Sequence, residues 1–184
     1  MNFVDYAPLA LRTAKSLPHD LQVQHAQLGM VTEVGELGDA IKKHFIYGKP
    51  FDKVNALEEI GDFCWYLNLY CDQEAIHARK LDERLASIDF KGGSEFSDVA
   101  LMLGLAGVTG ALMMPQSHIE ETTTITMVEL ATEILALLAC RWGSTLQACL
   151  DVNIKKLAAR YGDKYSDAAA LIRDLGAERK VLEG

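Results

Sequence analysis

The sequence predicts an all-α fold. Apolar residues recur at helical spacing almost throughout the 184 residues, whereas strand-like alternation of apolar and polar residues is scarce. The few glycine and proline clusters fall where helices would have to end. With 49% hydrophobic residues the chain can bury one good core, and its length favours a single domain or two small repeats.

Breaks in the helical pattern divide the first half of the chain. A short helix is expected from Phe3 to about Lys15, and Pro18 then interrupts the chain. Asp20 is a plausible N-cap for a long helix that runs to about Tyr47. The segment GKPFD at 48–52 reads as a turn, and a second long helix is expected from residue 53 into the 80s.

The second half begins after residues 89–94, whose Gly92-Gly93 pair predicts a break. Further helices are expected at about 97–113, 125–141 and 144–160, and a polar helix after Ser166. Two long helices joined by a short turn must lie antiparallel, and each needs further helices to cover its apolar stripe. This predicts a four-helix-bundle type of fold, in which metals bind between facing helices.

Two helical segments resemble each other at an offset of 75 residues. LGMVTEVGEL (28–37) and LGLAGVTGAL (103–112) share the Leu-Gly start, an internal glycine and the final leucine. The alignment sets Glu33 on Val108 and Glu36 on Ala111, so the second copy would have lost its carboxylates. Residues 91–142 are thus either a degenerate repeat of an active half at about 20–90 or an insertion. Residues 143–184 form a third, C-terminal segment.

Charge and composition narrow the functional classes. The net charge of −8 is spread along the chain, whereas a general nucleic-acid binder is usually basic, so no nucleic-acid polymer is expected as partner. The N-terminus lacks a basic, apolar signal, and no stretch reaches the roughly 18 uncharged apolar residues of a membrane span. We therefore expect a cytoplasmic protein without a membrane partner. The four cysteines lie in apolar stretches and are expected to be reduced and buried.

Two pairs of carboxylates carry the chemistry that the sequence suggests. Glu33 and Glu36 lie three residues apart on one predicted helix, and Glu59 and Asp62 on the next, so each pair shares a helix face. Antiparallel packing can bring the pairs together, where their charges would repel unless a cation neutralised them. Hard oxygen ligands favour Mg²⁺, with Mn²⁺ possible. Three glycines interrupt the first of these helices, Gly29, Gly35 and Gly38, which indicates close packing or close approach of a ligand.

The motif ExxE, 22 intervening residues and then ExxD, within HAQLGMVTEVGELGDAIKK and NALEEIGDFCWYL, resembles the MazG-like nucleoside triphosphate pyrophosphohydrolases. This superfamily also includes dimeric dUTPases and dCTP pyrophosphatases. A second block, DVNIKKLAARYGDKYS, looks like the family's Asn-xx-Lys-Leu-xx-Arg-Tyr segment. The chain departs from the family at Thr32, where many members have a second Glu, and at Gly162, where Pro is frequent.

The resemblance implies a MazG-like bundle and an enzyme that hydrolyses a (deoxy)nucleoside triphosphate to the monophosphate and pyrophosphate. Metal-activated water would attack the α-phosphorus. Glu33, Glu36, Glu59 and Asp62 would be the metal ligands and catalytic residues, and Glu58 a possible neighbour that assists them. Family members assemble into dimers or dimers of dimers, so a homodimer or homotetramer is expected.

Candidate substrate contacts flank the carboxylates. Lys43 shares the helix face of Glu36, and Lys42 and Lys155 are alternates should the faces be rotated. The phosphate contacts are expected to be Lys43, Asn153, Lys156, Arg160 and Tyr161. The base contacts are expected among Gln24, His25, Gln27 and Trp65.

Two alternatives remain open. The first is a non-catalytic helical interaction module that retains the motif without turnover. The second is a pyrophosphohydrolase that acts on another nucleotide such as phosphoribosyl-ATP, although its shorter family pattern lacks the NIKKLAARY block.

Overall fold

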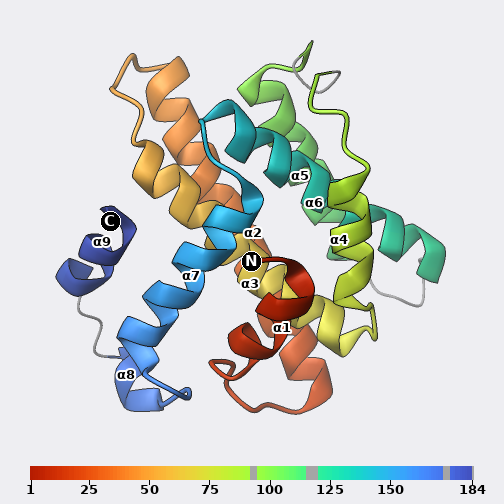
Figure 1. The fold of residues 1–184 in the computed structure, drawn as a ribbon. Coiled ribbons are helices and arrows are strands. Elements are labelled where there is room, and N and C mark those ends of the chain that lie inside the picture. Colours follow the sequence, from red (N-terminus) through yellow and green to blue (C-terminus); the bar gives the residue numbers. More distant parts are fainter. Residues whose placement is uncertain (92–94, 115–119, 172–174, 184) are drawn as a thin grey trace.

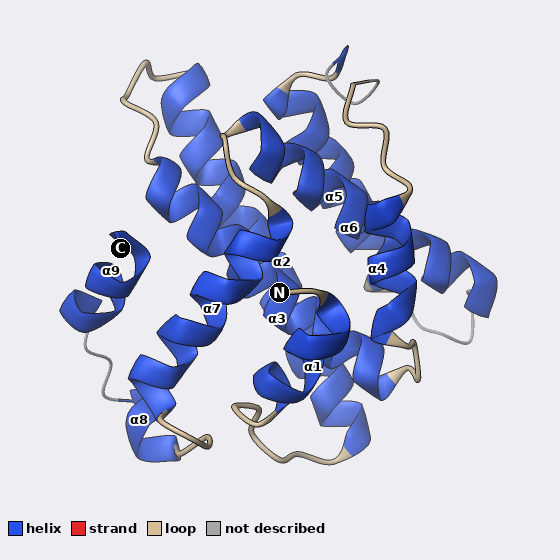
Figure 2. Cartoon of the chain, in the orientation of Figure 1, coloured by secondary structure: helices blue, strands red, loops and turns tan. Residues whose placement is uncertain are grey.

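The computed structural model describes residues 1–91, 95–114, 120–171 and 175–183, and over these it is all-helical. No strand occurs among the described residues (Figure 2), which confirms the expected all-α class. The helices in chain order are α1 (Phe3–Leu11), α2 (His19–Phe45), α3 (Lys53–Gln73), α4 (Ala78–Ala86), α5 (Asp98–Leu112), α6 (Glu121–Arg141), α7 (Leu146–Tyr161), α8 (Asp167–Leu171) and α9 (Leu175–Glu183).

Two helical hairpins form the centre of the molecule (Figure 1). The long helices α2 and α3 pack along each other, and α5 packs along α6. The hairpins meet through contacts of α2 with α5 and of α3 with α6. The blue helix α7 lies against α3, and α1 lies against both α7 and α3. As a result α3 is enclosed by other helices, and any site on it is reached between its neighbours.

Side-chain caps explain where three of these helices begin. Asp52, Ser97 and Thr145 each accept a hydrogen bond from the backbone N–H three residues further on, at the starts of α3, α5 and α7. Gly162 ends α7 with a φ of 64°, a conformation that glycine adopts without a steric cost.

Several expected helix boundaries are wrong, and the first helix, for example, ends at Leu11 and not at about Lys15. The second long helix does not run into the 80s, because α3 ends at Gln73 and Ala75 adopts a left-handed φ of 55° before α4 begins. Asp20 is not an N-cap, since α2 starts at His19, two residues earlier than expected, with Pro18 at the capping position. Asp20 instead lies in the first turn, where a carboxylate favours the helix dipole.

After Ser166 the described residues form the short helices α8 and α9, and residues 172–174 between them lie outside the described residues. The expected glycine break at 92–93 lies outside the described residues. The segments aligned as a repeat have a common burial pattern: Met30 and Leu105 are fully buried, as are Leu37 and Leu112, whereas Leu28 and Leu103 are exposed. Both segments also lie in the first helix of a hairpin, so the duplication stays a reasonable hypothesis.

One continuous apolar core joins the helices, and it contains a charged side chain. Tyr6, Phe63 and Tyr70 are among its largest fully buried members, and Lys156 is buried with them. Cys64, Cys71 and Cys149 are buried free thiols as expected. Cys140 is exposed, contrary to expectation, because it lies on the outer side of the last turn of α6.

One described helix, α6, is long and apolar enough to cross a membrane by length and composition alone. More than half of its most apolar stretch is buried, and it packs against α3, α4, α5 and α7. A core helix meets the same criterion, so α6 is weak support for a membrane span.

Candidate metal centre

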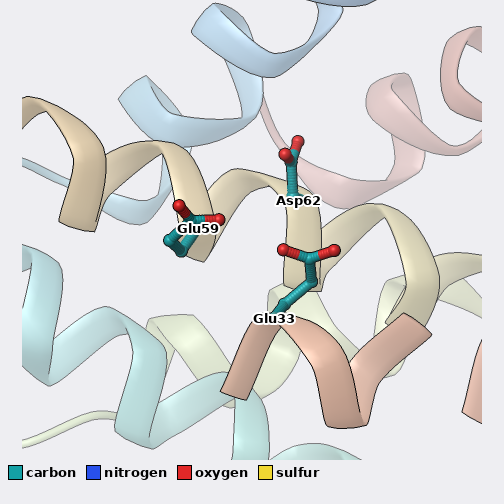
Figure 3. A group of neighbouring side chains, drawn as sticks. All are labelled: Glu33, Glu59 and Asp62. Atoms are coloured by element: carbon teal, nitrogen blue, oxygen red, sulfur yellow. The ribbon is translucent and has the colours of Figure 1, made fainter. Parts of the chain in front are cut away.

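Three carboxylates converge where α2 faces α3. Glu33 projects from α2, and Glu59 and Asp62 project from α3 one turn apart (Figure 3). Each offers an oxygen atom, and these three atoms all lie within 4.8 Å of one another. The i, i+3 spacing puts both α3 residues on one side of that helix, and the antiparallel hairpin brings Glu33 opposite them.

The electrostatics of this group suit a cation. Burial, followed by the charge of Asp62, raises the pKa of Glu33 to about 7 and that of Glu59 to about 9. Without a cation the cluster therefore retains protons near neutral pH, because the carboxylates are removed from water and repel one another. Hard carboxylate oxygens at this separation fit Mg²⁺ or Mn²⁺, which would replace those protons.

Glu36, the fourth expected ligand, lies outside the close group. It is exposed on α2 and lines a cavity together with Glu59 of the cluster. Glu33 and Glu36 have the same i, i+3 spacing as Glu59 and Asp62, so spacing alone does not decide which carboxylates converge.

Helix α7 supplies the polar partners of Asp62. Asn153 Nδ2 donates to Asp62 Oδ1 over 2.7 Å, and Lys156 Nζ contacts the same oxygen at 2.5 Å and also Oδ2. Lys156 also contacts Glu58 at 3.1 Å, so Glu58 is linked to Asp62 through this lysine. Burial by itself lowers the pKa of Lys156, but the charges of Asp62 and Glu58 outweigh this effect and raise it.

Lys156 and Asn153 are therefore not available as phosphate contacts, contrary to expectation. Their side chains are almost fully buried and already bound to Asp62. Lys155, the alternate, is exposed on the other side of α7, which settles the rotation of this helix.

Two glycines let the helices around the site approach closely. A Cβ atom at Gly61 would lie 3.1 Å from Cβ of Asn153 and 3.2 Å from the carbonyl oxygen of Cys149, so α7 can approach α3. A Cβ atom at Gly29 would lie 2.1 Å from the ring of Tyr66, which packs on the bare backbone of α2. Gly35 has no neighbour within 4 Å, and Gly38 has only ordinary contact with Met102. Close packing thus explains one of the three glycines of the α2 motif.

A cavity of about 550 Å³ opens beside Glu33 and Asp62. Its walls are largely aromatic and apolar, and three of the four expected base contacts, Gln24, His25 and Trp65, line it. Trp65 Nε1 donates to the Ala10 carbonyl oxygen and to Thr13 Oγ1, so its ring orientation is fixed. Gln27 is not part of this cavity, because its amide donates to the carbonyl oxygen of Leu112 on α5.

Arg160 and Tyr161 line the same cavity. The guanidinium of Arg160 donates to both carboxylate oxygens of Glu178 over 2.7 and 2.6 Å, which binds α9 to α7. Arg160 also lies over the Tyr161 ring, 5.7 Å from its centroid. A phosphate would have to share Arg160 with Glu178.

A second cavity, of about 700 Å³, shares Glu59 with the carboxylate cluster. Four carboxylates line it, those of Glu36, Asp39, Asp52 and Glu59, together with two lysines, Lys43 and Lys49. Lys43 and the alternate Lys42 are both paired with Asp39, at 2.6 and 2.8 Å. The cluster thus borders both an aromatic cavity and a charged one.

Three further residues border the site, of which sequence reasoning missed Tyr6 and Glu178. Tyr66 lies beside the cluster, where burial followed by the charges of Glu33 and Asp62 raises its pKa to about 12. Tyr6 and Glu178 reach the site through Asn153 and Arg160, from the two ends of the chain. Of the three, only Tyr66 had a local signal, Gly29, whose missing side chain makes room for an aromatic ring.

The arrangement can bind a cation between helices, with a flat apolar group on one side and a charged group on the other. No protein-family model, curated protein or solved structure matches this chain. The geometry and the sequence motif are therefore the grounds for assigning a function.

Proposed function

We propose that this chain is a MazG-like, Mg²⁺-dependent nucleotide pyrophosphohydrolase that converts a (deoxy)nucleoside triphosphate to its monophosphate and pyrophosphate. The observation that carries the proposal is the convergence of Glu33, Glu59 and Asp62 between an aromatic cavity and a cavity that contains lysines. The groups of a nucleotide follow the same sequence: a flat base, then the reacting phosphate, then further charged phosphates.

The fold supports this assignment. The α2–α3 hairpin carries both halves of the motif, and the α5–α6 hairpin packs against it as the second pair of a four-helix bundle would. The NIKKLAARY block lies on α7 and contacts the motif directly through Asn153 and Lys156.

Glu33, Glu59 and Asp62 would bind the metal directly. Glu36 would approach it from the charged cavity. Bound Mg²⁺ would offset phosphate charge and lower the pKa of a water molecule, so that hydroxide is available to attack phosphorus. Lys156 holds Asp62 in place, and a cation or a proton must balance Glu33 and Glu59.

We place the base of the substrate in the aromatic cavity and its departing pyrophosphate in the charged cavity. Gln24, His25, Trp65 and Tyr66 would surround the base, because aromatic faces and neutral amides suit a nucleobase. Lys43 and Lys49 would lie near the departing pyrophosphate in the charged cavity. Arg160 and Tyr161 would contact the sugar or phosphates from the aromatic side.

A second copy of the chain is the expected partner, in a homodimer or homotetramer, and α5 offers a surface for it. No exposed residue of α5 is polar or charged, so the solvent-facing side of this helix is apolar, whereas its polar residues Asp98 and Thr109 are buried. In a protein of net charge −8, such a face lets two copies meet without like-charge repulsion. The exposed residues of α5 are Val99, Ala100, Leu103, Gly104, Ala106, Gly107 and Gly110.

A substrate screen tests the activity. Incubation with each ribo- and deoxyribonucleoside triphosphate and Mg²⁺, with products separated by chromatography, should give a monophosphate and pyrophosphate from at least one of them. Release of single phosphates would indicate another reaction. The absence of any turnover by metal-loaded protein would favour the non-catalytic helical module.

A further inference from the structure

A chain of two hydrogen bonds runs from the N-terminal helix to the carboxylate cluster. The Tyr6 hydroxyl on α1 donates to Asn153 Oδ1 on α7 over 2.7 Å. Asn153 Nδ2 in turn donates to Asp62 Oδ1 on α3, also over 2.7 Å. Tyr6 is fully buried and Asn153 is 3% exposed, so water cannot easily replace either bond.

We propose that Tyr6 is a positioning residue of the metal centre, which fixes the Asn153 amide so that its NH₂ group holds Asp62 as a metal ligand. The inference rests on the proposed function, because it treats Asp62 as a ligand of Mg²⁺. Mutation of a residue that orients a metal ligand typically lowers metal affinity by about 10- to 100-fold.

The available donors and acceptors determine which group donates in each of these two hydrogen bonds. Asp62 accepts from the Lys156 ammonium, which can only donate, so a neighbouring amide must present its NH₂ group to the carboxylate. The Asn153 carbonyl oxygen then faces α1 and needs a donor. The Tyr6 hydroxyl is that donor, whereas a phenylalanine would leave the buried carbonyl unpaired and the amide free to rotate.

Helix α1 is anchored at both ends, which holds the hydroxyl in place. The Asp82 carboxylate on α4 accepts from the backbone N–H groups of Phe3 and Val4, over 2.8 and 3.0 Å. At the other end, Trp65 Nε1 donates to the carbonyl oxygen of Ala10 over 3.1 Å. Tyr6 lies between these two anchors, so its position is set by α3 and α4 as well as by its own helix.

Two other buried hydroxyl groups of the described chain donate only within their own helical segment. Those of Thr13 and Thr132 donate to a carbonyl oxygen within three or four residues of themselves. Tyr6 instead donates to a side chain 147 residues away, which is bonded to a candidate metal ligand. This difference supports a role at the site, and Thr132→Val provides a matched control that removes a buried hydroxyl on α6.

The test is the affinity for Mn²⁺, measured by electron paramagnetic resonance of the free ion without any nucleotide. Tyr6→Phe should weaken Mn²⁺ binding by about three- to tenfold, a smaller effect than direct outer-shell partners show. Thr132→Val should keep the wild-type affinity. Asn153→Ala should weaken binding at least as much as Tyr6→Phe, and the double variant should bind no more weakly than Asn153→Ala, because Tyr6 acts through Asn153.

The outcomes separate this inference from the proposed function. If the wild-type protein does not bind Mn²⁺, both are overturned. If the wild type binds and Tyr6→Phe matches it, or if the two substitutions act additively, only the positioning role is overturned.

A second measurement applies even if Tyr6→Phe does not fold. In ¹⁵N-labelled wild-type protein, the side-chain amide protons of Asn153 should exchange slowly with solvent, with Asn153→Ala identifying their signals. Free exchange would contradict the buried hydrogen-bond chain.

Discussion

The ammonium group of Lys156 lies 2.5 Å from Oδ1 of Asp62 and 3.1 Å from Oε1 of Glu58, and the lysine side chain is only 1% exposed. One buried cation thus balances two carboxylates. Lys156→Met should lower the free energy of unfolding by about 3 kcal/mol, the lower end of the range for broken buried pairs, because both carboxylates keep some contact with water.

Chemical denaturation of Lys156→Met and Lys155→Met measures this difference. Lys155 is the adjacent but exposed lysine, so its substitution should change stability by less than about 0.5 kcal/mol. Equal effects of the two substitutions would contradict the buried ion pair.

The stability of the metal-free protein should fall as the pH rises. Glu33 and Glu59 bind protons more tightly in the folded chain, with pKa values of about 7 and about 9 against 4.5 for an ordinary Glu. Their contribution to stability is therefore fully present below pH 4.5 and is lost as the pH rises through the two folded values.

Mg²⁺ binds the deprotonated carboxylates, so its stabilising effect should grow over the same pH range. Thermal melting between about pH 5 and 9, with and without Mg²⁺, measures both trends. Glu59→Gln should flatten both curves, whereas Glu83→Gln, an exposed control on α4, should leave them unchanged. A Mg²⁺ effect that is equal at all pH values would count against this cluster as the binding site.

Two glycines of α2 should respond to alanine in opposite directions. Gly29→Ala puts a Cβ atom 2.1 Å from the Tyr66 ring, so the ring must move, at a cost of about 1–3 kcal/mol of stability. Gly35→Ala meets nothing within 4 Å and should stabilise the protein by up to about 1 kcal/mol through helix propensity. Urea denaturation of the two variants measures both changes in stability. An undiminished stability of Gly29→Ala would show that packing of the Tyr66 ring on the α2 backbone does not stabilise the fold.

The contact between Arg160 and Glu178 should hold α9 against α7. Glu178 is 5% exposed and Arg160 14%, so Glu178→Gln leaves a buried guanidinium without its charged partner and should cost about 3 kcal/mol. Arg179→Gln, on the next residue, perturbs an exposed pair at 3.6 Å and should cost less than about 1 kcal/mol.

Hydrogen exchange of residues 175–183 gives a local measure of the same contact. Faster exchange is expected in Glu178→Gln. Unchanged exchange would show that other contacts hold α9.

The exposed face of α5 predicts the effect of a charge placed on it. Leu103 is 69% exposed, so Leu103→Glu should leave the fold of a single chain intact. If copies of the chain associate through α5, the same substitution buries a charge in the interface and should dissociate the oligomer. Sedimentation equilibrium measures the mass, with Val4→Glu on α1 as the control. A wild-type monomer, or an assembly that survives Leu103→Glu, would exclude this face as the interface.

The sequence predicted the fold class and the helical hairpin that carries the motif, because helical periodicity and turn residues are local signals. It failed at the end of α3, where Ala75 adopts a left-handed conformation that nothing in its residue type announces. It also failed at the start of α2, where Asp20 fitted a capping pattern but Pro18 occupies that position.

The carboxylates of the candidate site were predicted more completely than their surroundings. The spacing within each helix and the resemblance to the MazG-like motif singled out Glu33, Glu36, Glu59 and Asp62, of which all but Glu36 converge. Which residue contacts another helix does not follow from spacing. Gln27 therefore bonds to α5 instead of facing the cavity, and Lys156 is buried as a partner of Asp62.

Pyrophosphate release from nucleoside triphosphates, compared between wild type, Glu59→Gln and Glu83→Gln in the presence of Mg²⁺, tests the central claim most directly. The account predicts turnover by wild type and by Glu83→Gln, and a loss of at least about a hundredfold in Glu59→Gln, whose fold is checked by circular dichroism. Absence of turnover in the wild type, or undiminished turnover in folded Glu59→Gln, would contradict it.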